Sequence, residues 1–372
     1  MRAAPKVIDF LSEAQRQEIH DNSIRILEEV GMYVPHHAAL EKCAEKGALT
    51  DFAKESIRIP ARVMEDLLGK IKSESRYDVQ SDKSRKLSAG ISTQVYLFDY
   101  ETRSRRPGTT SDIRKGIMLL EKLNNFPGSG AVVLPSDVPA NVADIQAFHQ
   151  IFTYAAKQGG TFILTPESAR YIVEMSNVMG RGSGYFLETV SPLQFRRESL
   201  EMALVMTKMG CGIAVGPMVL GGALGPMTTA GNCSLQNAEL LGSMFVGHAL
   251  TGQYGFGYGS YNHVMDMRSM MCSFGSPNQA LLGVAAAEMS KFYGFWAASN
   301  SGLTDSFYPD YQCGIEKATT AVFSLLAGTG STGAMGIVGA DQGISLEQLV
   351  LDNEFINAYN YCMEGFEVNE ET

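Results

Sequence analysis

The sequence has little cysteine, and its cysteines form no pattern. Six cysteines are scattered over 372 residues, with no C-x-x-C pair and no histidine cluster beside them. Disulfide frameworks and zinc sites both need such clusters, so the sequence favours a reducing compartment and predicts no bound metal.

An excess of positive charge is also missing. Thirty Lys and Arg residues face forty Asp and Glu residues, which gives a net charge of −10. Nucleic acids and anionic membrane surfaces both require a basic face, so neither is expected as a partner. Small molecules and other proteins remain.

Long uninterrupted apolar runs are absent as well. The uncharged stretches 209–238 and 318–340 are broken repeatedly by glycine, and Pro217 and Pro226 interrupt the first. Asp9 precedes any apolar run at the N-terminus, which disfavours a signal peptide. We therefore expect a cytoplasmic protein without membrane spans.

Two common nucleotide and hydrolase motifs do not occur: there is no G-x-S-x-G elbow and no P-loop. Gly328, Gly330 and Gly333 spell G-x-G-x-x-G, but they follow a predicted helix and precede a predicted strand. A phosphate-binding version needs the reverse order, because the amides at a helix N-terminus must face the anion. The motif is interpreted as a helix stop followed by a loop.

Residues 1–92 differ in pattern from the rest. Apolar residues at helical spacing predict a helix over 12–31, with Ser12 as N-cap and Gly31 as the stop. Shorter amphipathic helices are predicted over 36–46 and 60–71, followed by a polar, loop-like stretch over 70–92. We interpret 1–92 as a helical cap region.

From residue 93 to 372 short apolar runs alternate with helical stretches, which favours an α/β fold with parallel strands. The predicted strands cover 95–99, 131–134, 161–165, 185–189, 213–216, 253–258, 295–298 and 334–338. The predicted helices cover 111–124, 143–157, 167–179, 198–209, 234–249, 278–293, 312–326 and 346–361. Eight repeats fit a (β/α)8 TIM-type barrel better than an open sheet, although the first strand is followed by a hairpin-like return over 100–107.

Barrel chemistry takes place on the loops that follow the strands. The loops over 216–232, 259–279 and 299–311 are long and rich in glycine, aromatic and polar residues, so we expect the site there.

Aromatic residues are concentrated in one part of the chain. Residues 254–311 hold twelve aromatics, where the overall 9% predicts about five, and 254–261 alternates rings with glycines. A strand with this alternation would present its rings on one face and bare backbone on the other. Two interpretations stay open: a packed barrel wall, or an aromatic cage for a cation that carries no N–H group.

Charged residues follow the same strands. His263 and Arg268 could bind a substrate carboxylate, although Arg268 could equally pair with Asp266. Acidic residues lie on or just after the next strand: Asp305, Asp310 and Glu316.

Several blocks of the chain together resemble the trimethylamine methyltransferase superfamily. They are 20–31, 57–60, 220–239, 266–268, 275–277, 309–312 with 316–317, and 345–349. They are spread over essentially the whole chain.

The resemblance implies a TIM barrel that moves a methyl group from a methylated amine to the cob(I)alamin of a separate corrinoid protein. The founding branch of the superfamily carries pyrrolysine, which we place in the loop around 305–309. This chain has ordinary residues there, so it resembles the branch without pyrrolysine, which includes glycine betaine methyltransferases. A quaternary amine fits that branch, because it leaves as a neutral tertiary amine without further activation.

The resemblance and the residue pattern together predict the site. The predicted catalytic residues are Asp305, Tyr308 and Glu316. The predicted substrate-binding residues are Tyr254, Phe256, Tyr258, Tyr261, His263, Arg268, Phe307 and Tyr311.

The predicted partners are a small quaternary amine, first of all glycine betaine, a corrinoid protein that carries cobalamin, and a second copy of the chain in a homo-oligomer. Proline betaine, carnitine and a binding protein without transfer activity remain as alternatives. The relatives continue well beyond 367–372, so the resemblance allows for a chain that is part of a longer protein.

Overall fold

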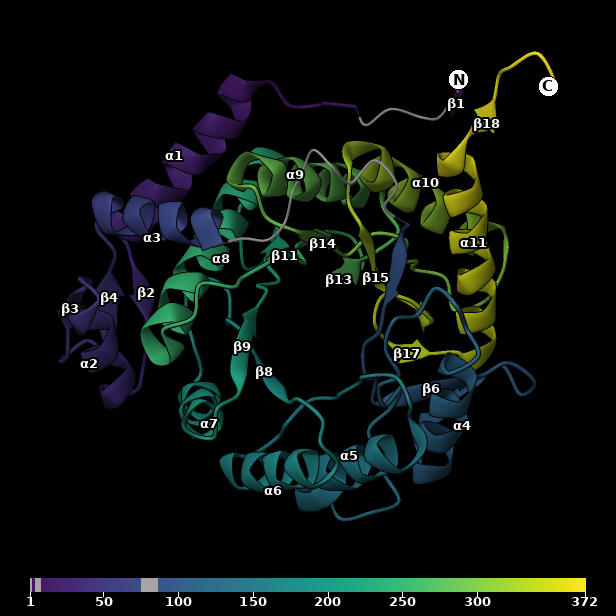
Figure 1. Cartoon of the computed structure of the whole chain (residues 1–372), viewed down its shortest axis with the longest axis horizontal. Helices are drawn as coiled ribbons and strands as arrows, with labels where there is room; N and C mark the ends of the chain where they lie inside the picture. Colours follow the sequence, from purple (N-terminus) through teal and green to yellow (C-terminus); the bar gives the residue numbers. More distant parts are fainter. Residues whose placement is uncertain (1, 4–7, 75–85) are drawn as a thin grey trace.

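The computed structural model describes residues 2–3, 8–74 and 86–372. Figure 1 shows short strands around a central space, with most helices on the outside. Of the predicted polar loop 70–92, residues 75–85 lie outside the described ranges. Within those ranges, every helix is too short or too polar to span a lipid bilayer.

The N-terminal helix begins and ends where the sequence predicts. Helix α1 (Glu13–Glu29) is capped by Ser12, which accepts from the backbone N–H of Gln15, while the Gln15 side chain accepts from the backbone of Ser12. Such reciprocal hydrogen bonds satisfy two amides that the helix itself cannot. Gly31 follows with a φ of 80°, and a Cβ there would lie 1.9 Å from the carbonyl oxygen of Ile57, so only glycine fits.

The rest of the N-terminal region is a small sheet with two helices. Strands β2 (Met32–Tyr33), β4 (Ser56–Arg58) and β3 (Leu49–Asp51) pair antiparallel in that order. Helices α2 (His37–Glu45) and α3 (Ala61–Glu74) accompany them, as predicted.

The later helices also lie within a few residues of the predicted ranges. They are α4 (Thr110–Leu120), α5 (Ala143–Tyr154), α6 (Pro166–Val178), α7 (Arg197–Lys208), α8 (Thr229–Thr251), α9 (Pro277–Tyr293), α10 (Tyr311–Ala327) and α11 (Leu346–Glu364), with a short 3-10 helix η1 (Ala140–Val142) before α5. Gly328 ends α10 with a φ of 104°, so the glycine motif includes the predicted helix stop.

Three pairs of parallel strands surround the central space. They are β8 (Gly184–Leu187) with β9 (Gly212–Val215), β11 (Tyr258–Ser260) with β14 (Ala297–Ser299), and β15 (Ser331–Ala334) with β5 (Ser88–Gly90). The segment predicted as a strand over 131–134 contributes one isolated parallel bridge, between Val133 and Gln94. The segment 161–165 forms no strand.

The first predicted strand has a different role. Residues 95–99 contain β6 (Tyr96–Asp99), which forms an antiparallel hairpin with β7 (Ser104–Pro107) beside β17 (Gly343–Ile344) and β16 (Ile337–Val338). Strand β5, inside the range 1–92, pairs with β15 instead. Its sequence Ser-Ala-Gly contains no β-branched or aromatic residue, so the pattern of the sequence hid it.

The long loops after β9 and β11 contain a second small sheet. Strand β12 (His263–Asp266) pairs parallel with β10 (Leu220–Gly221) and antiparallel with β13 (Met271–Ser273). Near the termini, β1 (Arg2–Ala3) pairs antiparallel with β18 (Phe366–Glu367).

Candidate functional site

The rings of the alternating segment 254–258 face the helices. The Tyr258 hydroxyl donates to Asn237 Oδ1 of α8 at 2.8 Å, and its ring stacks on Tyr293 of α9 at 5.9 Å between centroids. Burial raises the pKa of Tyr258. The Phe256 ring packs against Gly247 of α8, where an added Cβ would lie 3.0 Å from the nearest ring carbon. These contacts place both rings between the strand and the helices.

Tyr254 has yet another neighbour, because its ring lies 4.5 Å from that of His248 near the end of α8. The structure therefore does not bring Tyr254, Phe256 and Tyr258 together around one space. Their contact with a substrate stays a prediction.

Tyr261 lies on the opposite, inner face. A Cβ on Gly216 would lie 2.4 Å from its ring, and a Cβ on Gly259 would lie 3.2 Å from it. The ring centroid of Phe186 is 6.2 Å away. Burial raises the pKa of Tyr261 to about 12. The two glycines thus leave room for an aromatic pair that faces away from the helices.

An acid that sequence reasoning missed directly follows β8. Side chains alternate along a strand, so Gly184 and Phe186 share one face of β8, while buried Tyr185 and Leu187 share the other, and Glu188 directly follows the strand. Burial raises the pKa of Glu188, and the charge of Arg196 opposes that rise. The same alternation could have revealed this residue.

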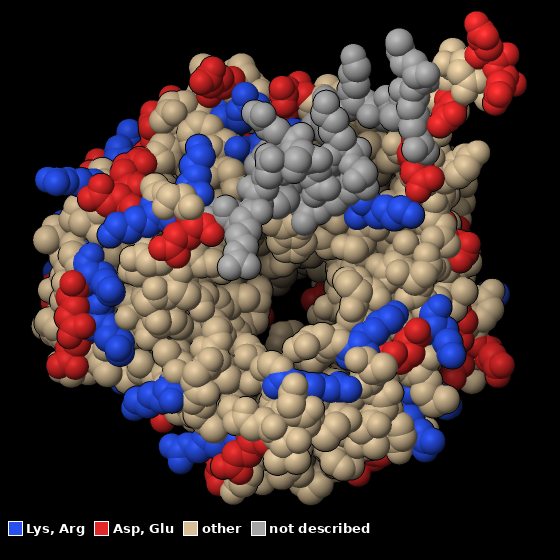
Figure 2. Space-filling model, viewed as in Figure 1, with Lys and Arg blue, Asp and Glu red and all other residues tan. Residues whose placement is uncertain are grey.

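A second acid, also missed, follows β16. The backbone N–H groups of Gly339 and Ala340 donate to the carbonyls of Ser306 and Thr304, which hold this turn against the loop after β14. Asp341 has a φ of 69°, and its Oδ1 accepts from Gln94 Nε2 at 2.7 Å. Burial raises the pKa of Asp341. Figure 2 shows that the molecule is hollowed at its centre and that acidic atoms are visible inside the hollow.

His263 has no exposed surface and no free ring nitrogen. Nδ1 lies 2.8 Å from Gln279 Oε1, and Nε2 lies 2.7 Å from Asn300 Nδ2. The ring stacks on Phe274 at 4.0 Å. Burial lowers the pKa of His263 to about 4, so the imidazole is neutral at pH 7 and offers no positive charge to a carboxylate.

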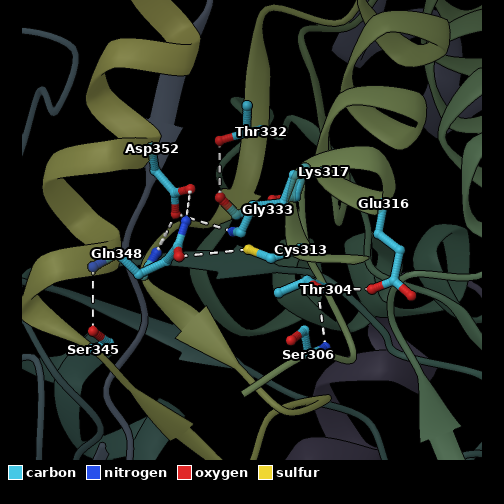
Figure 3. Close-up of polar contacts among 12 residues, drawn as sticks. Thr304, Ser306, Cys313, Glu316, Lys317, Thr332, Gly333, Ser345, Gln348 and Asp352 are labelled. Carbon is cyan, nitrogen blue, oxygen red and sulfur yellow. Dashed lines mark hydrogen bonds and ion pairs between the residues drawn. The ribbon is translucent and has the colours of Figure 1, made fainter. Parts of the chain in front are cut away.

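Two predicted acids, Asp305 in the loop 299–311 and Glu316 in α10, hold backbone groups in place. Asp305 accepts from the Ser273 hydroxyl at 2.7 Å and from the amides of Phe274 and Gly275. Glu316 accepts from the Thr304 hydroxyl at 2.7 Å, as Figure 3 shows, and from the Asp305 amide at 2.8 Å. Both carboxylates therefore fix the loop after β14 and the start of α9.

Phe307 and Tyr308 lie in an aromatic cluster at the same loop. The ring of Phe98 in β6 is 6.1 Å from Phe307 and 5.1 Å from Tyr308. The Arg103 guanidinium lies 5.5 Å from the Tyr308 centroid, within cation–π range. Gly339, two residues before Asp341, packs on the Phe307 ring.

Two predicted residues lie on the surface. Tyr311, the first residue of α10, is 84% exposed. Arg268 is exposed in the turn between β12 and β13, where its amide donates to Asp266 Oδ1 at 3.0 Å. Neither lies beside Tyr261 or His263 in any contact of the described residues.

A buried ion pair links α10 to α11 behind this loop. Lys317 Nζ lies 3.0 Å from Asp352 Oδ2 and donates to the carbonyl of Gly302 at 3.0 Å. Asp352 also accepts from the Gly336 amide and from Gln348 Nε2, and Figure 3 shows these side chains converging. Its four contacts keep both charges satisfied in the interior. Across the described ranges, no three His, Cys, Asp or Glu side chains are grouped closely enough to hold a metal ion.

A match to a known protein family covers the whole chain. A family described as trimethylamine methyltransferase (MTTB) matches residues 1–372. The chain belongs to this family. Its members are methyltransferases by name, so the chain is a methyltransferase.

Two named relatives cover nearly the whole chain. A glycine betaine methyltransferase of Desulfitobacterium hafniense (strain Y51) is 26% identical over 98% of this chain and 79% of its own length. A trimethylamine methyltransferase MttB of Desulfitobacterium hafniense (strain DSM 10664 / DCB-2) is 23% identical over 97% of this chain and 76% of its own length. The methyltransferase family therefore includes relatives named for both a quaternary and a tertiary amine.

Among solved structures, the monomethylamine methyltransferase MtmB of Methanosarcina barkeri superposes with a TM-score of 0.56 at 10% identity, covering 95% of this chain and 79% of that one. A hydroxylamine complex of MtmB gives a TM-score of 0.58, also at 10% identity, and covers 95% and 80% of the two chains. At this identity the likeness concerns the fold.

Proposed function

We propose that this chain transfers a methyl group from a small quaternary amine, with glycine betaine as the first candidate, to the cob(I)alamin of a separate corrinoid protein. The match of the methyltransferase family to residues 1–372 carries the proposal. The name of the glycine betaine relative supports the substrate. We place the reaction in the cytoplasm and expect a homo-oligomer.

The proposed scaffold is an eight-stranded (β/α)8 barrel over 93–372 with the helical cap region 1–92, extended by β5. Three parallel strand pairs and the parallel bridge between Gln94 and Val133 support it. The pairing of β15 with β5 joins the last strand of such a barrel to the first. In this arrangement the loops after β9, β11, β14 and β15 share one end.

The inner face offers suitable groups for a cation. Tyr261 and Phe186 present rings there, and the alternation of β8, continued by one residue, would place Glu188 on the same face. Ring faces and carboxylates both attract a quaternary ammonium, which cannot donate a hydrogen bond. We therefore assign the ammonium group to this face, beneath the loop that carries Phe307 and Tyr308.

The reaction needs alignment more than proton transfer. The electron pair for the new bond comes from cob(I)alamin, and the C–N pair stays on nitrogen, so a neutral tertiary amine leaves. No proton moves in this step, which removes the need for a general acid or base. The residues of the chain would hold nitrogen, methyl carbon and cobalt in line, an arrangement that can lower the barrier by several kcal/mol.

A single-turnover assay tests the proposal. The chain is mixed with reduced corrinoid protein and glycine betaine, and the loss of cob(I)alamin absorbance and the release of dimethylglycine are followed. We expect one molecule of dimethylglycine to be released for each cob(I)alamin that is methylated. Transfer from proline betaine or carnitine but not from glycine betaine would show that the substrate is one of those compounds. Binding of the amine without any transfer would show that the chain is a binding protein without transfer activity.

A further inference from the structure

The neutral state of His263 has a consequence for its neighbour Asn300. Gln279 Nε2 donates to two carbonyls, Asn262 O at 3.2 Å and Asn300 O at 2.8 Å. Its Oε1 is therefore the acceptor that faces His263, and the imidazole must carry its proton on Nδ1. Nε2 of His263 is left as an acceptor.

Asn300 has only one amide orientation that agrees with this tautomer. Its Nδ2 donates to His263 Nε2 at 2.7 Å and lies 3.4 Å from the carbonyl oxygen of Tyr261. Reversing the amide would bring Oδ1 against two acceptors. The orientation follows from the network, and Oδ1 must point the other way.

The other direction is the inner face. Strands β11 and β14 pair in the register Tyr258 with Ala297 and Gly259 with Ala298. Continued past the ends of both strands, the register would place Asn300 beside Tyr261 on the face of Gly259, and Asn300 Nδ2 lies 3.4 Å from the Tyr261 carbonyl oxygen. No described residue donates to Asn300 Oδ1, and a Cβ on Gly333 would lie 3.0 Å from this atom. The same Cβ would lie 2.9 Å from the Asn300 Cα, so glycine at 333 lets the two segments pack closely and keeps a methyl group off the oxygen.

We propose that Asn300 Oδ1 contacts the N-methyl groups of the quaternary amine, and that His263 and Gln279 are positioning residues that aim it. This deepens the proposed function and rests on it. The positive charge of a quaternary ammonium is spread over its methyl groups, which make C–H···O contacts with carbonyl oxygens. An uncharged amide oxygen also suits the chemistry, because a group that binds the starting cation too strongly would raise the barrier as the charge leaves nitrogen.

The test compares each quaternary ammonium compound with a molecule of the same shape whose head group is uncharged. Glycine betaine is matched with 3,3-dimethylbutanoate, and choline with 3,3-dimethylbutanol, in which carbon replaces the nitrogen. Dissociation constants are measured by calorimetry for the intact chain and for Asn300→Leu. We expect the intact chain to bind both quaternary ammonium compounds more tightly than their carbon isosteres. Asn300→Leu should reduce this ratio of dissociation constants about 5- to 10-fold, the range for one or two such contacts.

Matched variants separate this role from a structural one. Ser299→Ala removes a buried hydroxyl that has no hydrogen-bond partner, one residue away on the opposite face of β14, and should keep the full preference. Asn300→Ala provides a second truncation in case Asn300→Leu does not fold. Gln279→Glu cannot donate to both carbonyls, and should reduce the preference while ¹⁵N NMR shows a changed tautomer or protonation state of His263.

The outcomes are distinguishable. If the intact chain prefers the cations and both Asn300 variants keep that preference, the assignment of Asn300 is overturned while the proposed function stands. If the intact chain does not prefer either cation, both fall together. An unchanged preference in Gln279→Glu with an altered His263 signal would overturn the positioning role of His263 and Gln279.

Discussion

Burial of His263 links the ionisation of one side chain to the stability of the fold. Its pKa falls from 6.5 to about 4 because the ring is desolvated. A histidine whose pKa is depressed on folding stabilises the native state above its unfolded pKa, and this contribution is lost as the pH falls through the folded value. We expect a loss of about 3 kcal/mol between about pH 6.5 and 4.

The measurement is urea unfolding of the intact chain and of His263→Gln at pH 7 and pH 4.5. The difference in unfolding free energy between the two proteins should be smaller at the lower pH, because only the intact chain has an imidazole that binds a proton when unfolded and is kept mostly neutral by burial when folded. His149, which is exposed on α5, supplies the control variant His149→Gln. A pH-independent difference would contradict the prediction.

The ion pair of Lys317 and Asp352 leads to a second expectation at this scale. Lys317→Met would leave the Asp352 carboxylate buried without its cation, which costs about 3–5 kcal/mol in comparable pairs. Denaturant unfolding should show this loss. Lys54 pairs with Asp51 at 3.7 Å on the surface, so Lys54→Met should change stability little. Equal effects of the two variants would show that burial is not the cause.

Individual side chains could be predicted from the sequence only in part. The period of two predicted a strand over 253–258 with its rings on one face, whereas only Tyr258 of this range lies in β11 and the rings of Tyr254 and Phe256 have different neighbours. The sequence could not say which rings meet the helices, because that depends on contacts with the distant helices α8 and α9. Tyr261 has the opposite parity and joins the inner face. Asn300 and Gln279 carry no local signal, because their roles depend on contacts with distant segments.

Glycines control access to the inner face at the level of the strands. A Cβ on Gly216 would lie 2.4 Å from the Tyr261 ring and 2.8 Å from Phe186. Gly216→Ala should therefore displace the Tyr261 ring and weaken quaternary amine binding by about 1 kcal/mol, the worth of one cation–π contact. Calorimetric titration with glycine betaine measures this.

Two further variants make the comparison specific. A Cβ on Gly184, at the start of the inner face of β8, would meet only the Gly212 carbonyl at 3.5 Å, so Gly184→Ala should bind normally. In a Tyr261→Ala background, Gly216→Ala should have no additional effect. An undiminished effect in that background would show that Gly216 acts through another neighbour.

Elements were predictable where local chemistry defines them. Helix α1 begins at a capping box and ends before a glycine with positive φ, signals that are present in the sequence itself. Strand β5 has no such signal, because three small residues become a strand only through pairing with β15. Strand β6 has stronger strand residues, so 95–99 was predicted as the first of the eight strands, whereas β6 forms an antiparallel hairpin with β7.

The whole molecule should respond to occupation of its centre. A ligand that binds only the folded chain stabilises it by about 2.7 kcal/mol when its concentration is 100 times the dissociation constant. We set glycine betaine at 100 times the dissociation constant of the intact chain and use this one concentration for both proteins. It should raise the melting temperature of the intact chain in a thermal scan, and it should raise that of Tyr261→Ala by less. The same rise in both proteins would place binding away from the inner face.

The pairing of β15 with β5 also has a consequence for folding during synthesis, because β5 is made long before its partner strand. The register joins Ser88 to Ser331, 331 − 88 = 243 positions later. A ribosome that adds about 5–20 residues per second needs roughly 10–50 s to cover that distance. During that interval the backbone groups of β5 cannot pair with β15, and an unpaired strand edge can pair with another chain and start aggregation. The chain should therefore depend on chaperones during synthesis, until residue 334 has left the ribosome.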